Sequence, residues 1–133
     1  LADKLFDEAD YNAADMIVLP GGQPGADNLN RHNGLKAQIE MYHSRNKDIA
    51  AICAAPLVLG STGVLKGKRA TCYPGVEGKL TGATCTGNLV ETDGNIVTGK
   101  GPGAAMAFAF TLVERLAGKN KADELKKAMV IEA

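Results

Sequence analysis

The stretch that decides the fold is DIAAICAAPLVLG, residues 48–60. Residues 48–52 form a short apolar run, which is typical of a strand buried on both faces of a parallel sheet. Residues 54–60 predict a helix with Pro56 in its first turn, where a backbone N–H has no partner within the helix. One cysteine, Cys53, separates the two segments. The sequence therefore predicts a buried strand that turns at Cys53 directly into a helix.

The same alternation of short apolar runs and amphipathic segments continues along the chain, and it predicts an α/β fold layered around a mainly parallel sheet. Further strands are expected at residues 15–20, closed by Pro20-Gly21-Gly22, at residues 69–73, and in a hairpin of residues 88–92 and 95–98 around Asp93-Gly94. Helices are expected at residues 34–46, 104–116 and 119–129, with Met106, Phe110, Val113 and Leu116 facing a core.

Length and composition limit the possible classes of protein. The chain has 133 residues, of which 45% are hydrophobic and 23% charged, and it has no linker or repeat, so we expect one domain over residues 1–133. No apolar run is long enough to cross a membrane. Fifteen basic and fifteen acidic residues cancel, which gives no electrostatic basis for binding nucleic acid. Three cysteines at no metal-ligand spacing predict free thiols and a cytoplasmic location, with neither a cofactor nor a metal site.

Cys53 is the candidate nucleophile. In Ala51-Ile52-Cys53-Ala54-Ala55, small residues flank the cysteine as they do in a nucleophile elbow, where the chain turns sharply and exposes the reactive side chain. The positive end of a helix lowers the pKa of a nearby thiol, and the thiolate is both the nucleophilic and the oxidisable form. The alternative interpretation is that Cys53 is a small hydrophobic residue buried at a strand end.

Gly21 and Gly22 end the other buried strand. Parallel strands deliver their carboxyl ends to the same edge of a sheet, so this pair is expected near Cys53. Backbone N–H groups there, together with the amide of Ala54, form a candidate oxyanion pocket. A plain turn between a strand and a helix explains the two glycines equally well.

These motifs, in this order, resemble the DJ-1/PfpI (ThiJ-like) family, in its DJ-1 branch: residues 17–22 (IVLPGG), 50–56 (AAICAAP), 71–74 (TCYP) and 101–103 (GPG). The resemblance covers nearly the whole chain. It implies a three-layer flavodoxin-like sandwich, also described as class I glutamine amidotransferase-like, and usually a homodimer. It also implies that Cys53 is the reactive cysteine, that Gly22 and Ala54 are backbone donors, and that Gly21, Tyr73 and Pro102 line the pocket.

The chain departs from the family pattern in two ways. Tyr73 stands where many relatives carry a histidine, and a phenol is a poor base near neutral pH. The family domain also begins with strands that carry a glutamate bonded to the cysteine sulfur, and this sequence, which starts at Leu1, begins after them. We therefore expect that the segment with those strands is a separate chain, is disordered, or has been left out of this sequence.

The resemblance implies an enzyme that acts on reactive carbonyls or glycated adducts, in the manner of a glyoxalase or deglycase. An alternative is a redox-sensing or chaperone-like protein of oxidative stress, in which Cys53 is oxidised to a sulfinate. A cysteine peptidase is a third, weaker possibility. Amide hydrolysis needs an acid to protonate the leaving amine, and the histidine that could supply this proton is absent. Cys72 and Cys85 lack an elbow context. A disulfide between Cys53 and Cys72 under oxidation is a further hypothesis. His32 and His43 are expected to be solvated.

Overall fold

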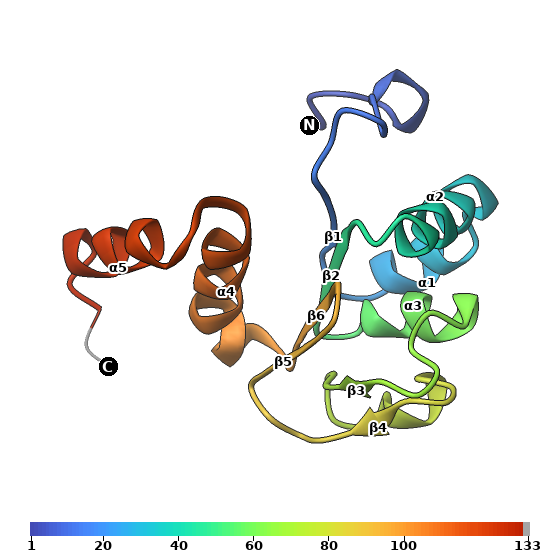
Figure 1. The fold of residues 1–133 in the computed structure, drawn as a ribbon. Coiled ribbons are helices and arrows are strands. Elements are labelled where there is room, and N and C mark those ends of the chain that lie inside the picture. Colours follow the sequence, from blue (N-terminus) through green and yellow to red (C-terminus); the bar gives the residue numbers. More distant parts are fainter. Residues whose placement is uncertain (132–133) are drawn as a thin grey trace.

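A computed structural model describes residues 1–131 and places a four-stranded sheet at its centre (Figure 1). The strand order is β1-β2-β6-β5. β1 pairs with β2 and β2 with β6 in parallel, whereas β5 and β6 form an antiparallel hairpin. A separate two-stranded parallel ladder joins β3 to β4. The strands are β1 (Met16–Leu19), β2 (Asp48–Ile52), β3 (Arg69–Ala70), β4 (Thr84–Cys85), β5 (Val90–Asp93) and β6 (Ile96–Gly99).

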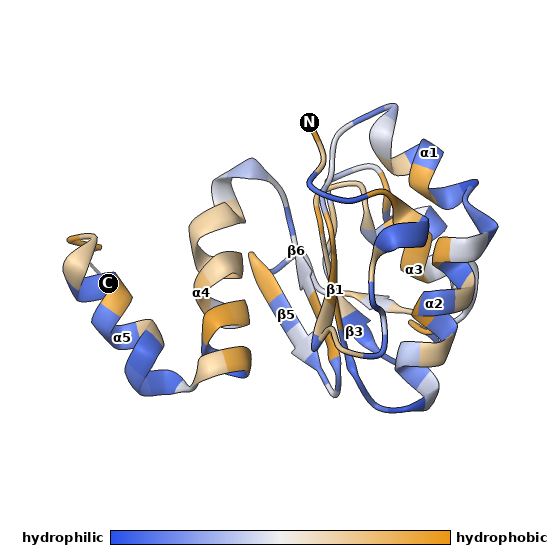
Figure 2. Ribbon diagram, turned by 90° about the horizontal axis from the view of Figure 1, so that it is seen from above, coloured by the Kyte–Doolittle hydropathy of each residue, from blue (hydrophilic) through white to orange (hydrophobic). Residues whose placement is uncertain are grey.

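Helices cover the two faces of the sheet, so the described chain has three layers (Figures 1 and 2). α1, α2 and α3 lie on one face, α4 lies on the other, and α5 packs against α4 and extends away from the sheet. The helices are α1 (Gly25–Asn30), α2 (Asn33–Ser44), α3 (Pro56–Thr62), α4 (Ala105–Ala117) and α5 (Lys119–Ala128), with short 3-10 turns at η1 (Phe6–Glu8), η2 (Glu77–Lys79) and η3 (Pro102–Ala104).

β2 is buried on both faces because its side chains alternate between two cores. Ile49 and Ala51 belong to the larger core beneath α1, α2 and α3, and Ala50 belongs to the smaller core beneath α4. All three side chains are fully buried. Successive residues of a strand point to opposite faces, so a central strand covered by two helix layers must be apolar at consecutive positions. The short apolar run before Cys53 is therefore correctly predicted as a doubly buried strand.

The expected core face of α4 is wrong. Met106 and Leu116 are 45% and 53% exposed, whereas Phe108 is buried against Ala50 and Val97 of the sheet. The helix is apolar on more than one side, so spacing alone does not identify the side that faces β2 and β6. Phe110, also expected to face the core, is buried but belongs to neither core of the sheet; the Lys126 ammonium of α5 lies over its ring.

Several element boundaries also differ from the prediction. The strand expected at residues 69–73 is only Arg69–Ala70, since Thr71 already bonds to side chains and loops instead of a neighbouring strand. The hairpin is present, but Asp93 pairs with Ile96, so its two turn residues are Gly94 and Asn95. Helix α1 was not predicted, because its six residues include two asparagines and an aspartate, which favour turns.

Candidate active site

Cys53 follows the last residue of β2 and has a left-handed backbone conformation, with φ of 65°. Its N–H donates to the carbonyl of Gly99 at 2.9 Å, and its own carbonyl accepts from the N–H of Tyr73 at 2.8 Å. Non-glycine residues rarely adopt this conformation, which costs roughly 1–2 kcal/mol. The end of β6 and the segment after β3 therefore hold Cys53 in a strained turn, as a nucleophile elbow requires.

The helix after the elbow begins at Pro56, two residues later than the predicted start at Ala54. Ala54 and Ala55 form a turn, in which the N–H of Ala55 donates to the carbonyl of Ile52 at 3.1 Å. Ala55 already has helical backbone angles, φ of −61° and ψ of −26°, so the chain enters α3 through this turn. The seven-residue α3 then ends at Gly63.

Gly21 lies directly against the elbow. A Cβ at this position would overlap the Cβ of Cys53 and would stand 2.7 Å from the carbonyl oxygen of Ile52. It would also stand 3.3 Å from the backbone nitrogen of Ala54. Only glycine permits so close an approach of the two chain segments. The ends of β1 and β2 therefore meet here, as their parallel pairing predicts.

Gly22 and Ala54 carry the two expected backbone donors. Within residues 1–131, neither N–H group donates a hydrogen bond to another protein group. Gly22 is exposed, and its φ of 92° turns the chain away from the strand direction. Both residues adjoin the close contact between Gly21 and Cys53 in sequence, so their N–H groups remain candidate donors for an oxyanion.

The three cysteines have different environments. Cys53 is partly exposed, Cys72 is buried and Cys85 is exposed, and all three are free thiols. Burial, with a smaller effect from nearby Cys85, raises the pKa of Cys72 to about 12, and burial also raises the pKa of Cys85. Both side chains are therefore neutral thiols at physiological pH and weak nucleophiles. Cys53 alone has the elbow backbone.

Tyr73 and Pro102, the other expected pocket residues, are placed differently. Tyr73 is 49% exposed and lines a hollow of about 170 Å³ beside the elbow. A Cβ on Gly101 would lie 3.5 Å from the Tyr73 ring, so the loop after β6 forms the facing wall. Pro102 is exposed and does not line this hollow, although Gly101 and Gly103 on either side of it do.

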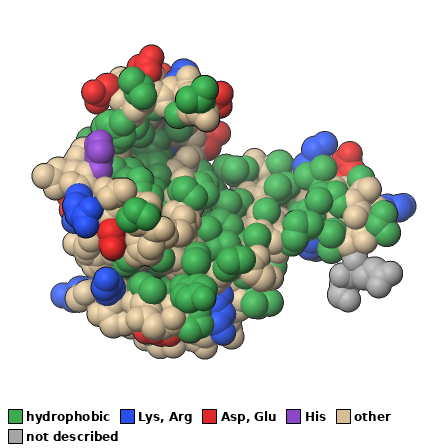
Figure 3. Space-filling model, turned by 180° about the vertical axis from the view of Figure 1, so that it is seen from behind, with side chains coloured by type: hydrophobic (Ala, Val, Ile, Leu, Met, Phe, Trp, Pro, Cys, Tyr) green, Lys and Arg blue, Asp and Glu red, His purple; other side chains and the backbone are tan. Residues whose placement is uncertain are grey.

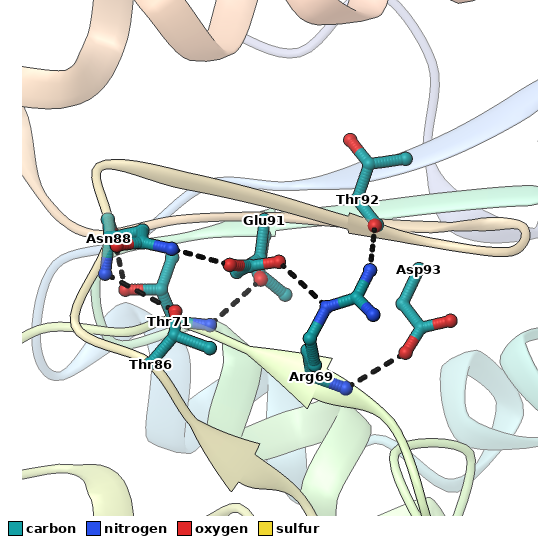
Figure 4. A network of polar contacts seen from close by, with 8 residues as sticks. Arg69, Thr71, Thr86, Asn88, Glu91, Thr92 and Asp93 are labelled. Carbon is teal, nitrogen blue, oxygen red and sulfur yellow. Dashed lines mark hydrogen bonds and ion pairs between the residues drawn. The ribbon is translucent and has the colours of Figure 1, made fainter.

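A polar network that sequence reasoning missed anchors the segment leading to Tyr73 (Figure 4). The N–H of Thr71 donates to Oγ1 of Thr98 at 3.0 Å, and the Thr71 hydroxyl donates to the carbonyl of Asn88 at 2.6 Å. The Asn88 amide donates to Glu91 at 2.7 Å, and this hydrogen bond lowers the pKa of the Glu91 carboxyl. The network binds the segment after β3 to the β5–β6 hairpin and so fixes one wall of the hollow.

The histidines have no place at the elbow. Nδ1 of His32 accepts from the N–H of Leu35 at 2.9 Å and so caps α2, and the His32 ring packs on Phe6; these contacts make it a structural residue as well as an exposed one. His43 lies on α2 and is partly buried rather than fully solvated. In the part of the chain that the structure describes, no three His, Cys, Asp or Glu side chains are grouped as metal ligands. No helix among these residues has the length and apolar character to cross a membrane.

The family model of the DJ-1/PfpI family matches residues 1–115. Protein dj-1beta of Drosophila melanogaster is 38% identical over 133 residues, which cover 98% of this chain and 71% of that protein. The chain belongs to the DJ-1/PfpI family. Protein DJ-1 homolog A of Arabidopsis thaliana is 42% identical, but the chain spans only 34% of that protein's length.

Two solved structures extend the comparison to the fold. The crystal structure of Drosophila DJ-1beta matches with a TM-score of 0.84 and 35% identity, covering 92% of this chain and 68% of that one. A structure described as oxidised DJ-1 of Toxoplasma gondii has the same TM-score and coverage, with 33% identity. This agreement confirms the flavodoxin-like α/β fold of the DJ-1/PfpI family that the sequence predicts.

Proposed function

We propose that this protein is a cysteine-dependent enzyme that acts on reactive carbonyls, in the manner of a glyoxalase or deglycase. The observation that carries the proposal is the geometry of Cys53: a strained, partly exposed elbow residue next to two backbone N–H groups that have no other partner. A partly exposed cysteine beside backbone N–H groups suits attack on a carbonyl carbon, because such donors stabilise the oxygen that becomes negatively charged.

The proposed reaction begins when the thiolate of Cys53 adds to the aldehyde carbon of a 2-oxoaldehyde such as methylglyoxal. The aldehyde oxygen becomes the oxyanion of a hemithioacetal, which the N–H groups of Gly22 and Ala54 stabilise. A proton then moves from the former aldehyde carbon to its neighbour, which leaves a thioester. Water hydrolyses the thioester to lactate and returns the thiolate. In this proposal a glutamate outside the present sequence transfers the proton, because Tyr73 is a poor base near neutral pH.

The test compares three single variants, each made in protein that also contains the segment carrying the glutamate. Replacing Cys53 by serine is expected to lower lactate formation from methylglyoxal by roughly 10³-fold or to background. The matched variants Cys72→Ser and Cys85→Ser are expected to keep activity within a factor of about two, because neither thiol is a thiolate at neutral pH. The proposal is wrong if Cys53→Ser and the native chain turn over methylglyoxal equally.

A redox sensor is the second candidate function, and the oxidised Toxoplasma DJ-1 structure favours it. In this proposal Cys53 reacts with peroxide to a sulfenate and then a sulfinate, each step inserting one oxygen atom and releasing water or an alcohol. Mass spectrometry after mild peroxide treatment distinguishes the two functions. A stable sulfinate at Cys53 together with no turnover of methylglyoxal favours the sensor. A disulfide between Cys53 and Cys72 would appear in the same spectra.

We further propose that the chain works as one domain in the cytoplasm, where its free thiols stay reduced, and that other polypeptide completes it. The partner is a second copy, a separate chain that carries the N-terminal strands of the family domain, or both. This proposal is supported by β1, which pairs on one side only and leaves Val18 46% exposed. An unpaired apolar strand favours the addition of another strand.

A further inference from the structure

The lining of the hollow next to the elbow includes a lysine, Lys100, to which the proposed reaction assigns no role. The hollow holds about 170 Å³ and is lined by seven residues: Tyr73, Pro74, Leu89, Lys100, Gly101, Gly103 and Ala104. The two segments that form its walls also hold the backbone of Cys53. The N–H of Tyr73 donates to the Cys53 carbonyl. On the other wall, the carbonyl of Gly99, the residue before Lys100, accepts from the Cys53 N–H. These bonds fix the walls relative to the backbone of Cys53, which does not itself line the hollow.

Lys100 is the one charged side chain in this lining, and it is only partly exposed. Its ammonium donates to the carbonyl of Gly87 at 3.1 Å, which uses one of its three protons. Among residues 1–131 it forms no ion pair, unlike Arg69, Arg115, Lys119 and Lys121.

The acidic side chains on this side of the molecule are already engaged (Figure 4). Glu91 accepts from Asn88 and contacts Arg69 at 3.4 Å, and Asp93 accepts from the N–H of Arg69 at 2.9 Å. The polar network thus holds Glu91 with Arg69 instead of with Lys100, and Asp93 lies at the other end of the hairpin, where it pairs with Ile96. An ammonium with spare donors and no carboxylate partner favours an anionic ligand.

Size and polarity narrow the class of anion. One water molecule occupies about 30 Å³ in the liquid, so the hollow accommodates roughly five or six non-hydrogen atoms. The Tyr73 ring and Leu89 give it apolar walls, and both side chains are about half exposed, so the hollow is open to solvent on one side. These features fit a short carbon chain that ends in a carboxylate.

We propose that Lys100 selects 2-oxoaldehydes whose far end carries a carboxylate, with the aldehyde at Cys53 and the carboxylate at the Lys100 ammonium. This inference rests on the function proposed above and names its substrate class. Lys100 takes part in no bond change: the aldehyde carbon forms and later breaks the bond to sulfur, while the carboxylate only forms an ion pair. A suitable probe substrate is 4,5-dioxopentanoate, and its methyl ester is the matched neutral compound.

The first experiment measures binding without chemistry. Levulinate has the same carboxylate chain as the probe but no aldehyde, and methyl levulinate lacks the charge. Binding is followed by NMR shifts of the backbone amides around the hollow in the native chain and in Lys100→Met. Levulinate is expected to bind the native chain about tenfold more tightly than its ester, and Lys100→Met is expected to remove this difference. Lys100→Arg is expected to restore it, and Lys36→Met, which changes another partly exposed lysine, is expected to have no effect.

The second experiment measures kcat/KM for 4,5-dioxopentanoate, its methyl ester and methylglyoxal. The native chain is expected to prefer the acid about tenfold over the ester, and Lys100→Met is expected to lower kcat/KM for the acid alone. Equal kcat/KM for acid and ester, or an equal loss for all three substrates in Lys100→Met, would overturn the inference while leaving the proposed function intact. Selective, Lys100-dependent binding of levulinate without turnover of any aldehyde would support the anion site and refute the proposed function.

Discussion

Cys53 combines a left-handed φ of 65° with hydrogen bonds from both of its backbone groups. The motif of small residues around a cysteine predicts the sharp turn, because sequence neighbours decide whether the chain has room to turn. The partners that hold it, the carbonyl of Gly99 and the N–H of Tyr73, lie 46 and 20 residues further along the chain. They come from tertiary structure, so the sequence pattern indicates the nucleophile but not its supports.

The strain at Cys53 predicts an unusual stability for its variants. Glycine adopts a left-handed φ without the steric cost of roughly 1–2 kcal/mol, although it loses about 0.5–1 kcal/mol more conformational entropy on folding. Cys53→Gly is therefore expected to unfold with a free energy up to about 1 kcal/mol larger than that of Cys53→Ala. Urea unfolding of both inactive variants measures this difference. An alanine variant as stable as the glycine variant would show that Cys53 is not strained.

Lys100 illustrates what residue patterns leave undetermined. The segment GKGPG lacks the spacing of a phosphate loop, and this comparison by itself says nothing about an anion site. A better signal was available: residues that follow a parallel strand lie at the same edge as the nucleophile, and Lys100 follows β6 directly. Whether a lysine there remains without a carboxylate partner depends on the engagement of Glu91 with Arg69, which only the folded chain determines.

At the scale of elements, α3 and the segment that carries η2 are joined by a close contact at Gly60. A Cβ on Gly60 would overlap the carbonyl oxygen of Lys79 and stand 2.8 Å from the Cα of Leu80. The sequence offers Gly60 and Gly63 as ends of the helix. The structure places Gly60 inside α3 and makes Gly63 its left-handed C-cap. At position 60, glycine serves close packing between two segments rather than helix termination.

This contact predicts opposite outcomes for two glycine-to-alanine substitutions. Gly60→Ala is expected to lower the free energy of unfolding by about 1–3 kcal/mol, because backbone on both sides must move to admit the methyl group. Gly25→Ala, in α1, meets nothing within 4 Å and is expected to be neutral or stabilising by up to about 1 kcal/mol. Urea unfolding of both variants provides the measurement, and equal effects would show that α3 does not pack closely on the η2 segment.

At the scale of the molecule, the two edges of the main sheet differ. β5 is an outer strand, but the segment that carries β3 covers its edge (Figure 4). Arg69 contacts the carboxylates of Glu91 and Asp93. Thr71 donates to the carbonyl of Asn88, just before β5. β1 is the other outer strand, and an apolar hollow of about 390 Å³ adjoins it. Figure 3 shows apolar side chains gathered on the face between the body of the molecule and the helical arm of α4 and α5.

The alternation of apolar runs predicts the layers well. A strand that helices cover on both faces is apolar at consecutive positions, whereas an element covered on one face is apolar only on that face. It predicts the uncovered surfaces poorly. Val18 and Met106 belong to apolar runs typical of buried elements, yet they are 46% and 45% exposed. An apolar residue in a sequence indicates surface that some neighbour covers, without identifying that neighbour. The alternation therefore does not separate an apolar residue that the described fold buries from one that it leaves exposed.

The open β1 edge predicts that the isolated chain associates with itself. Unpaired backbone groups beside an exposed valine favour pairing with another strand, and a lysine at such an edge opposes it by electrostatic repulsion and by its hydration. Val18→Lys is expected to weaken association at least tenfold, as measured by sedimentation velocity between about 5 and 200 μM. Met41→Lys places the same charge on a comparably exposed side chain of helix α2 and is expected to leave association unchanged.

If the native chain sediments as a monomer throughout this range, or if both variants weaken association equally, the β1 edge is not the contact. The α4–α5 arm, with exposed Met106 and Leu116, would then be the surface to alter next.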